Sequence, residues 1–292
     1  FGDEKDRVLI KSDGQFTYLA ADIAYHHHKF SREGVEGTPQ YNRIVNIWGA
    51  DHHGYIPRMR GAIEALGHPV NEFEILLGQL VNLIVDGEKA RMGKRRKMLT
   101  LADVVEEVGV DATRFWMVNK SADTTLDFDV NLAASATDEN PVYYVQYAHA
   151  RCAGILRNAT QDNVNVATGE KAPALLTEEA LKAYEQNLTA DHLSAMLDNL
   201  DSDEARQRVK DLILKLDQFE DLVVDAANLR APHLLARYAL ELSADFHGLY
   251  NVCRILTPDA DVTLGRLMVI IALKKILAQT LYLLGVSAPD RM

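Results

Sequence analysis

The sequence predicts an α/β region followed by an all-α region, and two contrasting patterns in its 292 residues support this prediction. The first third alternates short β-branched runs with helical segments and turn residues. Beyond about residue 140, apolar residues recur at helical spacing and no convincing strand is found. We therefore predict one domain over residues 1–130 and a helical domain over residues 131–292.

The α/β region is predicted from runs of apolar residues bounded by turn residues. Gly67 is suited to a left-handed helix end, and Asp86-Gly87 to a hairpin turn. Thr100 and Asp103 have the spacing that opens a helix, and Gly109 can end it. Asp111 is expected to cap the next helix. The expected elements are strands at 8–11 and 16–18, a helix at 19–30, a strand within 41–48, a helix at 56–66 and extended chain at 73–85.

The second region has the pattern of a helical bundle. Pro141 is placed to begin its first helix, and the polar residues 162–173 are predicted to form a loop. The most apolar stretch, residues 264–284, is interrupted by Arg266, Lys274 and Lys275, which favours a packed helix over a membrane span. The later helices are expected at 177–186, 203–216, 232–256 and 263–284.

Composition indicates a soluble globular protein, with 48% apolar and 25% charged residues. The net charge of −11 is not that of a typical nucleic-acid binder, although a local basic patch can still bind phosphate. Cys152 and Cys253 match no metal-binding spacing, so we expect two buried thiols in a reducing cytoplasm. The chain begins on Phe1 with no signal-like segment, which suggests a piece of a longer protein.

A basic loop follows the Asp86-Gly87 turn, with five cations in the seven residues from Arg91 to Lys97. Backbone N–H groups and mobile cations of this kind suit the developing charge of a triphosphate. Charge alone favours a solvated basic loop.

Residues 48–55 place an acid and two histidines after an expected strand. Ligands bind beyond the carboxyl ends of parallel strands, so Asp51 and His52 are candidates for a nucleotide site. A two-metal phosphoesterase site is an alternative, but it needs further aspartate pairs that the chain does not supply. A structural role beside a turn remains open for His53.

Tyr18 and Asp22 lie four residues apart at the start of an expected helix, and therefore on one face. A carboxylate beside an aromatic ring suits a guanidinium group, although the local pattern alone favours an ordinary helix-face carboxylate for Asp22. The run His26-His27-His28 fans around a helix, so we assign no metal.

Together these motifs resemble arginyl-tRNA synthetases, and the resemblance spans residues 7–292. The KMSKS loop of that class I family is matched at residues 91–95, with Gly93 in place of the usual Ser and Arg91 in place of Lys. The other matching segments are residues 99–114, G-A-D-H-H-G-Y at 49–55, the tyrosine-to-tyrosine run 18–25, the helix opening 140–151 and the terminal run 284–292.

The resemblance implies the second half of a Rossmann-type catalytic domain followed by an α-helical, DALR-type anticodon-binding domain. No H-x-G-H segment is found, so the first half of the active site is expected to lie before Phe1 or in a separate chain. The implied activity is ATP-dependent formation of arginyl-adenylate from L-arginine with Mg2+, then transfer to the 2′-hydroxyl of the terminal adenosine of arginine tRNA. The isolated chain is expected to be catalytically incomplete, and a tRNA-binding module without catalysis is the alternative.

The resemblance also assigns roles to particular residues. Lys94, with Arg91, is expected to neutralise the leaving pyrophosphate, and Met92, Gly93 and Arg95 complete that loop. Tyr18 and Asp22 are expected to bind the arginine side chain, and Asp51 and His52 to line the adenosine and arginine pocket.

For tRNA, the candidates are Tyr147, Arg151, Tyr250 and Met292, because splayed anticodon bases stack on aromatic rings while arginine holds phosphates. His247 and Arg254 are weaker candidates on the same helical pattern. Each candidate taken alone is better explained as a core residue, because an aromatic residue at helical spacing usually packs inward. We expect a cytoplasmic monomer that does not bind membranes.

Overall fold

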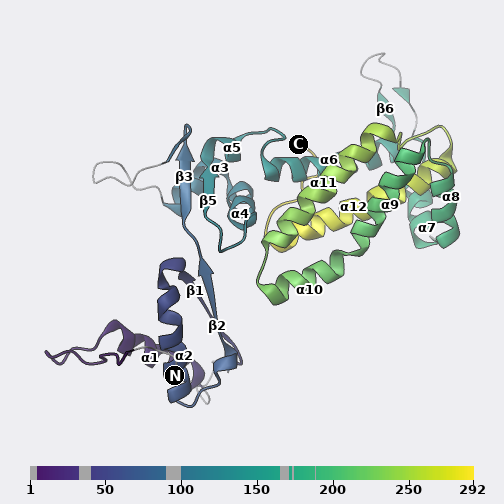
Figure 1. The fold of residues 1–292 in the computed structure, drawn as a ribbon. Coiled ribbons are helices and arrows are strands. Elements are labelled where there is room, and N and C mark those ends of the chain that lie inside the picture. Colours follow the sequence, from purple (N-terminus) through teal and green to yellow (C-terminus); the bar gives the residue numbers. More distant parts are fainter. Residues whose placement is uncertain (1–4, 33–40, 90–99, 165–170, 173, 188) are drawn as a thin grey trace. The chain divides into compact units, whose positions relative to one another are not determined.

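The computed structural model describes residues 5–32, 41–89, 100–164, 171–172, 174–187 and 189–292. Across these residues the protein is mostly helical with three small sheets (Figure 1). Its contacts divide it into two compact units, one of residues 1–81 with 122–126 and one of residues 82–121 with 127–292. The predicted boundary between residues 130 and 131 coincides with the start of the mainly helical part of the chain. That this position separates two domains stays a prediction.

The first unit is built on a parallel strand pair. Strand β1 (Ile44–Gly49) pairs with β2 (Phe73–Gly78), with Ile44 opposite Phe73. Parallel strands need a crossover, and here it comprises η1 (Ala50–Tyr55), α2 (Ile56–Ala65) and η2 (Val70–Glu72). The predicted strand and helix are confirmed, and Gly67 has the expected positive φ of 77°.

A small apolar core holds this crossover against helix α1 (Tyr18–Phe30). Its buried members are Ile44, Met59, Ile63 and Phe73. Residues of α1, β1 and η1 pack against them, namely Leu19, Ile23, Phe30, Trp48 and Tyr55. The same packing that stabilises the unit therefore fixes η1 at the carboxyl end of β1.

The two strands predicted at 8–11 and 16–18 are wrong. Only an isolated bridge joins Ile10 to Phe16, and those side chains are 57% and 72% exposed. A two-stranded hairpin with nothing covering its apolar side chains is marginal in water, which accounts for the difference.

A second sheet has the order β4-β3-β5, from β3 (Val81–Val85), β4 (Glu88–Lys89) and β5 (Leu126–Asp129). The predicted turn is confirmed, since Asp86 and Gly87 have φ of 53° and 77° between the antiparallel strands β3 and β4. Strand β5 and the short helix α5 (Val130–Ala134) were not predicted.

Two short helices follow, α3 (Leu101–Val108) and α4 (Val110–Val118). The predicted capping box is confirmed: Thr100 accepts from the Asp103 backbone N–H, and Asp103 accepts from that of Thr100. Gly109 ends α3 with φ of 84° and also precedes α4 directly. The prediction that Asp111 caps α4 is therefore wrong. Asp111 lies inside the first turn, and its carboxylate accepts hydrogen bonds from Gln146 and Ser287.

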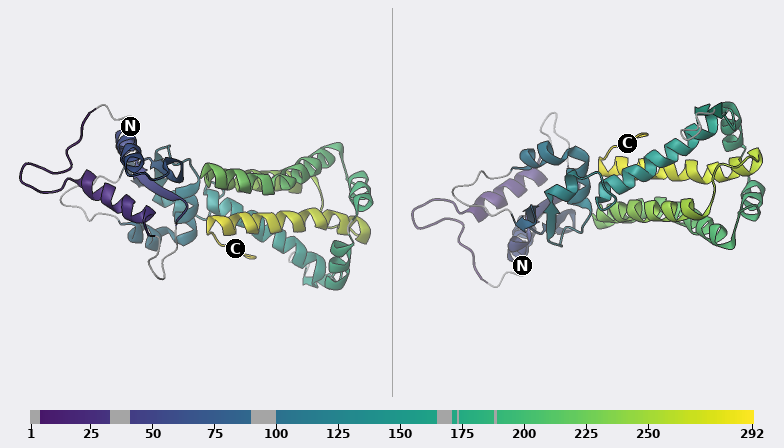
Figure 2. Two further views of the ribbon diagram at one scale, coloured as in Figure 1. Left: turned by 90° about the horizontal axis from the view of Figure 1, so that it is seen from below. Right: turned by 90° about the horizontal axis from the view of Figure 1, so that it is seen from above.

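The rest of the second unit is a helical bundle, in which α12 (Ala260–Leu284) lies between α6 (Pro141–Thr160) and α11 (His233–Val252) (Figure 2). The predicted helices are confirmed, but the one predicted at 232–256 ends at Val252, so Arg254 lies beyond the helix that carries His247. The helices α8 (Ala190–Asp198) and α10 (Phe219–Leu229) were not predicted. Two two-residue strands, β6 (Asn163–Val164) and β7 (Lys171–Ala172), replace part of the predicted loop. The helices are α6 (Pro141–Thr160), α7 (Glu178–Gln186), α8 (Ala190–Asp198), α9 (Asp203–Asp217), α10 (Phe219–Leu229), α11 (His233–Val252) and α12 (Ala260–Leu284).

Helix α12 is the core of this bundle. By length and hydropathy alone it is able to cross a membrane, yet half of its most apolar window is buried inside the protein. It packs against α4, α6, α7, α8, α9 and α11. Its buried Arg266 pairs with Asp201 on the loop before α9.

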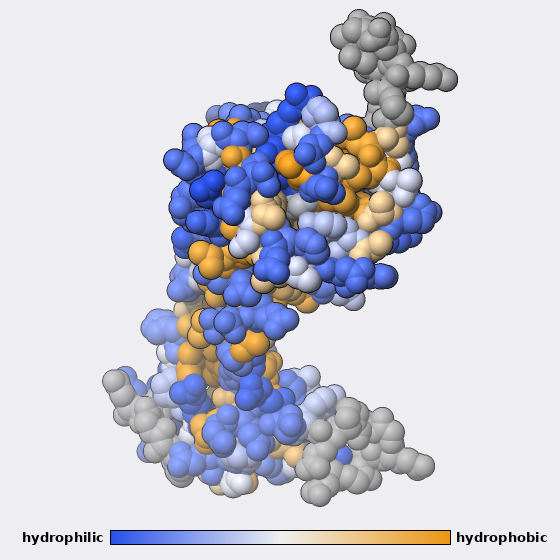
Figure 3. Space-filling view, turned by 90° about the vertical axis from the view of Figure 1, so that its right-hand side faces the viewer, coloured by the Kyte–Doolittle hydropathy of each residue, from blue (hydrophilic) through white to orange (hydrophobic). Residues whose placement is uncertain are grey.

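Hydrophilic residues cover most of the face drawn in Figure 3, with apolar residues confined to patches. Cys152 and Cys253 are free and buried, as expected.

Candidate functional site

The structure brings together three of the four residues proposed for RNA. Tyr147 and Arg151 lie one turn apart on α6, and Tyr250 lies on α11, which packs against α6. The Arg151 guanidinium carbon is 4.4 Å from the centre of the Tyr250 ring. Arg151 Nη1 also donates to the Tyr147 hydroxyl at 3.2 Å. We call Tyr147, Arg151 and Tyr250 the aromatic–arginine cluster.

Further rings extend this cluster along the two helices. Tyr143 and Tyr147 are nearly parallel, with an interplanar angle of 8° and 6.2 Å between ring centres. His247 from α11 continues the stack, 5.8 Å from Tyr147 at 24°, and lies 5.0 Å from Tyr144. Tyr143, Tyr147 and His247 are half-buried, so each ring keeps an accessible part.

The rings of this site lie near one guanidinium, that of Arg151, and near the carboxylates of Asp138 and Asp245. Burial lowers the pKa of His247, and nearby Arg151 lowers it further while Asp138 opposes the shift. Burial, with Asp138 and Asp245, raises the pKa of Tyr144. Both rings are therefore neutral at pH 7, and Arg151 supplies the positive charge. Stacked neutral rings beside a guanidinium can hold unstacked bases and one phosphate.

A cavity of about 590 Å3 adjoins the cluster. Tyr250 forms part of its wall. The rest comes from α6, the end of α11, the segment 253–256 that follows α11, and the loop before α9. Arg254 lies on this wall, with Nε donating to the Leu256 carbonyl at 3.1 Å. The fourth proposed residue, Met292, ends the chain and is 55% exposed.

The first unit contains a second candidate site at Asp22. The Tyr55 hydroxyl donates to Asp22 Oδ2 at 3.2 Å, and the ring of Trp48 lies 5.8 Å from that of Tyr55. Burial and the neighbouring Asp22 raise the pKa of Tyr55 to about 12, so its hydroxyl stays a donor. Tyr18 begins the same helix as Asp22 but is 92% exposed.

Asp51 and His52 occupy η1, directly after the carboxyl end of β1. Asp51 Oδ2 is 3.7 Å from His52 Nε2, and the side chains are 81% and 61% exposed. A Cβ atom on Gly49 would lie 2.6 Å from Asp51 Oδ1, so the Asp51 carboxylate lies directly over the end of β1. Because η1 also carries Tyr55, one segment presents Asp51 and His52 and positions the partner of Asp22.

Two of the three consecutive histidines, His26 and His27, have partners within the same unit. His26 is buried, with Nδ1 2.7 Å from the Asp22 carbonyl oxygen and Nε2 2.6 Å from Asn46 Nδ2. His27 Nδ1 is 2.8 Å from His68 Nε2. Within the described residues no group of three His, Cys, Asp or Glu side chains is placed to hold a metal ion.

Comparison with known proteins identifies the helical unit. A family model described as the DALR anticodon binding domain matches residues 145–292, which is half of the chain. The chain belongs to the DALR anticodon-binding domain family.

Relatives that match the chain over its whole length are named as arginine–tRNA ligases. It is 44% identical to the arginine–tRNA ligase of Listeria monocytogenes and 40% identical to that of Oceanobacillus iheyensis. Each alignment covers 100% of this chain and 46% of the relative, so the chain spans about half the length of the curated relatives it matches.

Solved structures give the same result. A structure assigned to an arginyl-tRNA synthetase of Campylobacter jejuni matches with a TM-score of 0.73 and 34% identity, over 100% of this chain and 56% of that one. The Thermus thermophilus arginyl-tRNA synthetase matches with a TM-score of 0.69 and 25% identity, over 98% of this chain and 51% of that one.

Some of the predicted site residues lie outside the described part of the chain, and two site residues seen in the structure were not predicted. The predicted loop residues Arg91, Met92, Gly93, Lys94 and Arg95 lie outside the described residues. Tyr55 and Tyr143, by contrast, were not singled out. Tyr143 lies one helical turn before Tyr147, and Tyr55 ends the same run that contains Asp51, so periodicity and adjacency were the available signals.

Proposed function

We propose that the chain is part of an arginine–tRNA ligase and that its helical unit binds the anticodon loop of arginine tRNA. The aromatic–arginine cluster carries this proposal, because it lies inside the matched anticodon-binding domain. Bases of a single-stranded loop stack on accessible aromatic faces, and a guanidinium binds phosphate oxygens. The net charge of −11 disfavours broad electrostatic binding, so a local site must supply the affinity.

Binding of a labelled anticodon stem-loop hairpin, followed by fluorescence anisotropy, tests this function. Loss of a stacking ring is worth about 1–3 kcal/mol per base, so Tyr250→Ala should weaken binding about 5- to 150-fold. Arg151→Met should weaken binding and reduce the slope of log affinity against log salt by about one.

Matched controls separate the cluster from general surface effects. Tyr282→Ala removes a tyrosine that is 74% exposed on α12, and Arg237→Met removes an exposed arginine of α11 that pairs with Glu241. Both controls should leave hairpin affinity within about twofold of wild type. Equal affinity for a hairpin with a scrambled anticodon would contradict anticodon recognition, and absence of binding would refute the function.

For the first unit we propose the second half of a Rossmann-type catalytic domain. The parallel β1–α2–β2 arrangement supports this, with candidate ligand-binding residues at the carboxyl end of β1. Asp22 would accept the arginine guanidinium, with Tyr55 and Tyr18 beside it. Asp51 and His52 would line the adenosine and arginine pocket.

The remaining chemistry is proposed for the loop at residues 91–95. An arginine carboxylate oxygen bonds to the α-phosphorus of ATP and pyrophosphate leaves, its charge neutralised by Lys94 and Arg91. The terminal 2′-hydroxyl of the tRNA then attacks the arginyl carbonyl, and AMP leaves. Mg2+ would screen the phosphates, and we assign no residue to it.

Pyrophosphate exchange with arginine, ATP and tRNA tests the catalytic part. Because the chain spans 46% of its relatives, we expect hairpin binding without exchange from the chain alone. Exchange by the isolated chain would overturn the incomplete-site proposal. Metal-dependent phosphate-ester hydrolysis lost in Asp51→Ala would instead support a phosphoesterase. A cytoplasmic, monomeric protein stays a prediction.

A further inference from the structure

A buried histidine–asparagine pair connects strand β1 to the turn of α1 that carries Asp22. His26 of α1 is 5% exposed and Asn46 of β1 is 9% exposed. His26 Nδ1 lies 2.7 Å from the backbone carbonyl oxygen of Asp22, and His26 Nε2 lies 2.6 Å from Asn46 Nδ2. One imidazole ring therefore contacts β1 on one side and the Asp22 backbone on the other.

The two contacts define the tautomer of the His26 ring. A carbonyl oxygen only accepts, so Nδ1 carries the hydrogen and donates it to Asp22. The amide nitrogen of Asn46 only donates, so Nε2 is the acceptor. Both bonds form together in the neutral ring protonated at Nδ1. An edge contact with Phe73, with 5.3 Å between ring centres and an interplanar angle of 83°, completes the packing of the ring.

Stability alone does not explain a polar pair at this position. Polar groups moved into an apolar core lose their contacts with water, and the hydrogen bonds between them do little more than replace those contacts. Two apolar side chains of similar size can serve such a core equally well. What the pair adds is direction, since hydrogen bonds fix the angle between α1 and β1 more closely than apolar contacts do. The core around the pair is small, and its buried members are Ile44, Met59, Ile63 and Phe73.

The pair is the second of two restraints on Asp22. The first is Tyr55 of η1, whose hydroxyl donates to Asp22 Oδ2 at 3.2 Å. Tyr55 and Asn46 belong to one continuous stretch, because η1 follows β1 directly. The side chain and the backbone of Asp22 are therefore both held against the segment that presents Asp51 and His52.

We propose that His26 and Asn46 are positioning residues that hold the Asp22 carboxylate in place for the guanidinium of arginine. This role rests on the proposed function, in which Asp22 accepts that guanidinium. Pairing of a guanidinium with a carboxylate depends on direction, because two parallel N–H groups need acceptors at defined angles. An acceptor that is already ordered loses less free energy on binding than one that the ligand must order. Both residues are buried, so they act through Asp22 and not on arginine itself.

The position of Asp22 is measured first, without arginine, through the ionisation of Tyr55. Burial and then the Asp22 carboxylate raise the pKa of Tyr55 to about 12, while Arg58, 5.5 Å from the ring centre, opposes them. A carboxylate that moves away from the hydroxyl no longer disfavours the phenolate. Tyr55 should therefore ionise at lower pH in His26→Leu and in Asn46→Leu. NMR of the full chain labelled at the tyrosine Cζ atoms records this titration, with the Tyr55 signal assigned by Tyr55→Phe.

Two further variants calibrate the titration. Asp22→Asn removes the charge itself, so it sets the decrease in the pKa of Tyr55 that complete loss of the carboxylate produces. His26→Leu and Asn46→Leu should each give part of that decrease. His27→Asn is the matched control, because His27 is the next residue of α1 and contacts His68 instead, at 2.8 Å. It should leave the titration unchanged, and an unchanged titration in both leucine variants would overturn the proposal.

Arginine binding is measured next on the full chain, by NMR titration with L-arginine and, as the reference, L-citrulline. Citrulline has nearly the same shape and no positive charge, so the difference between the two ligands reports recognition by the carboxylate. His26→Leu and Asn46→Leu should each raise the Kd for L-arginine about 2- to 10-fold, the equivalent of ordering one side chain. The double substitution should bind no more weakly than either single one, because the pair forms one link. His27→Asn should bind as wild type does.

The double substitution also keeps the test valid where a single one unfolds. Each single leucine leaves one buried polar group without its partner, whereas the double removes both groups. The double variant should therefore fold, with a lowered pKa of Tyr55 and weakened arginine binding. A double variant that does not fold shows that the core needs the pair for stability, and this result refutes the positioning role.

The remaining outcomes separate the positioning role from the function on which it rests. Wild-type titration and wild-type arginine affinity in the folded double variant refute the role of the pair, while arginine recognition by Asp22 stands. Additive losses in His26→Leu and Asn46→Leu also refute it, since the two residues then act separately. A wild-type chain that does not distinguish L-arginine from L-citrulline overturns the proposed role of Asp22, and the role of the pair with it.

Discussion

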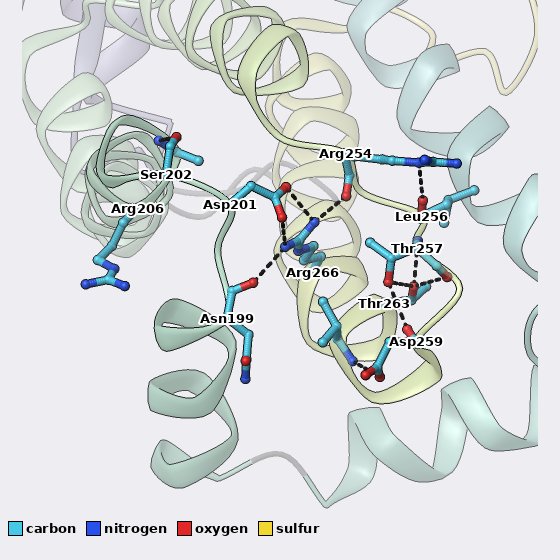
Figure 4. Close-up of polar contacts among 12 residues, drawn as sticks. Asn199, Asp201, Ser202, Arg206, Arg254, Leu256, Thr257, Asp259, Thr263 and Arg266 are labelled. Atoms are coloured by element: carbon cyan, nitrogen blue, oxygen red, sulfur yellow. Dashed lines mark hydrogen bonds and ion pairs between the residues drawn. The ribbon is translucent and has the colours of Figure 1, made fainter.

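Replacing Asp201 with asparagine should lower the stability of the helical bundle, because Asp201 accepts hydrogen bonds from the buried guanidinium of Arg266. Arg266 projects from α12 and is 3% exposed (Figure 4). It donates to both carboxylate oxygens of Asp201, at 3.0 and 3.1 Å, and to the Asn199 carbonyl at 2.7 Å. It also donates to the Arg254 carbonyl. One side chain thus joins the loop before α9 and the segment after α11 to the core helix.

The size of the effect follows from the different burial of the two partners. Asp201 keeps 54% of its side chain exposed, so water screens the pair and Asp201→Asn should cost about 1–2 kcal/mol of unfolding free energy. Arg266→Met leaves several carbonyl and carboxylate oxygens without their donor and should cost about 3–5 kcal/mol. The double substitution should cost less than the sum, because either single change already removes the shared contact.

The effect of Asp201→Asn should depend on pH. The hydrogen bond from Arg266 is the main cause that holds the pKa of Asp201 below its usual value of 3.8. A carboxylate with a lowered pKa stabilises the folded state above the unfolded pKa, and this stabilisation is lost as the pH falls through the folded pKa. The difference between wild type and Asp201→Asn should therefore be full at pH 7 and shrink below about pH 4.

Urea unfolding followed by tryptophan fluorescence measures these changes in one unit. Trp48 lies in the first unit and Trp116 in the second. In a Trp48→Phe background, the fluorescence of Trp116 therefore reports unfolding of the second unit. Asp198→Asn, an exposed carboxylate at the end of α8, is the control and should change stability by less than about 0.5 kcal/mol. Strict additivity of the Asp201 and Arg266 substitutions, or no loss in Asp201→Asn, would refute the reasoning.

Three further changes test other parts of the second unit. Gly285→Ala places a Cβ in a left-handed conformation against the Arg114 guanidinium and should cost about 1–3 kcal/mol in urea unfolding; a neutral result would contradict this close approach. Thr100→Ala removes the capping box and should cost about 1 kcal/mol, seen as a lower Tm, whereas an unchanged Tm would argue against it. Burial lowers the pKa of His149 below 6.5, so stability should be complete above that pH and fall as the solution is acidified. His149→Asn should flatten this dependence between pH 7 and 5, and an unchanged slope would exclude His149 as its cause.

Most of the secondary structure follows from local signals that act over a few residues. Thr100, Gly109 and Pro141 mark helix ends by hydrogen bonding or backbone conformation that tertiary structure has no reason to override. The wrong strand predictions lie where a segment has strand propensity but no described segment packs against it. Ile10 and Phe16 have strand propensity, but the described structure supplies no surface to cover them, so only a bridge forms.

The candidate sites divide in the same way. Tyr147 and Arg151 are four residues apart, so helical spacing alone places them on one face. Tyr250 lies about a hundred residues further along the chain, and only the resemblance to a known family connected it with them. His247 could be placed on α11 by periodicity, yet its stacking on Tyr147 depends on how α6 and α11 pack.

Asp111 shows why the remainder could not be predicted. An aspartate just before a helical run is the usual signal for a cap, because its carboxylate can accept from exposed N–H groups of the first turn. Gly109 already occupies the position before α4, which leaves the Asp111 carboxylate available for another donor. That donor is Ser287, 176 residues away in sequence, together with Gln146. A capping aspartate and a long-range acceptor are the same residue type in the same local sequence, so only the packed structure distinguishes them.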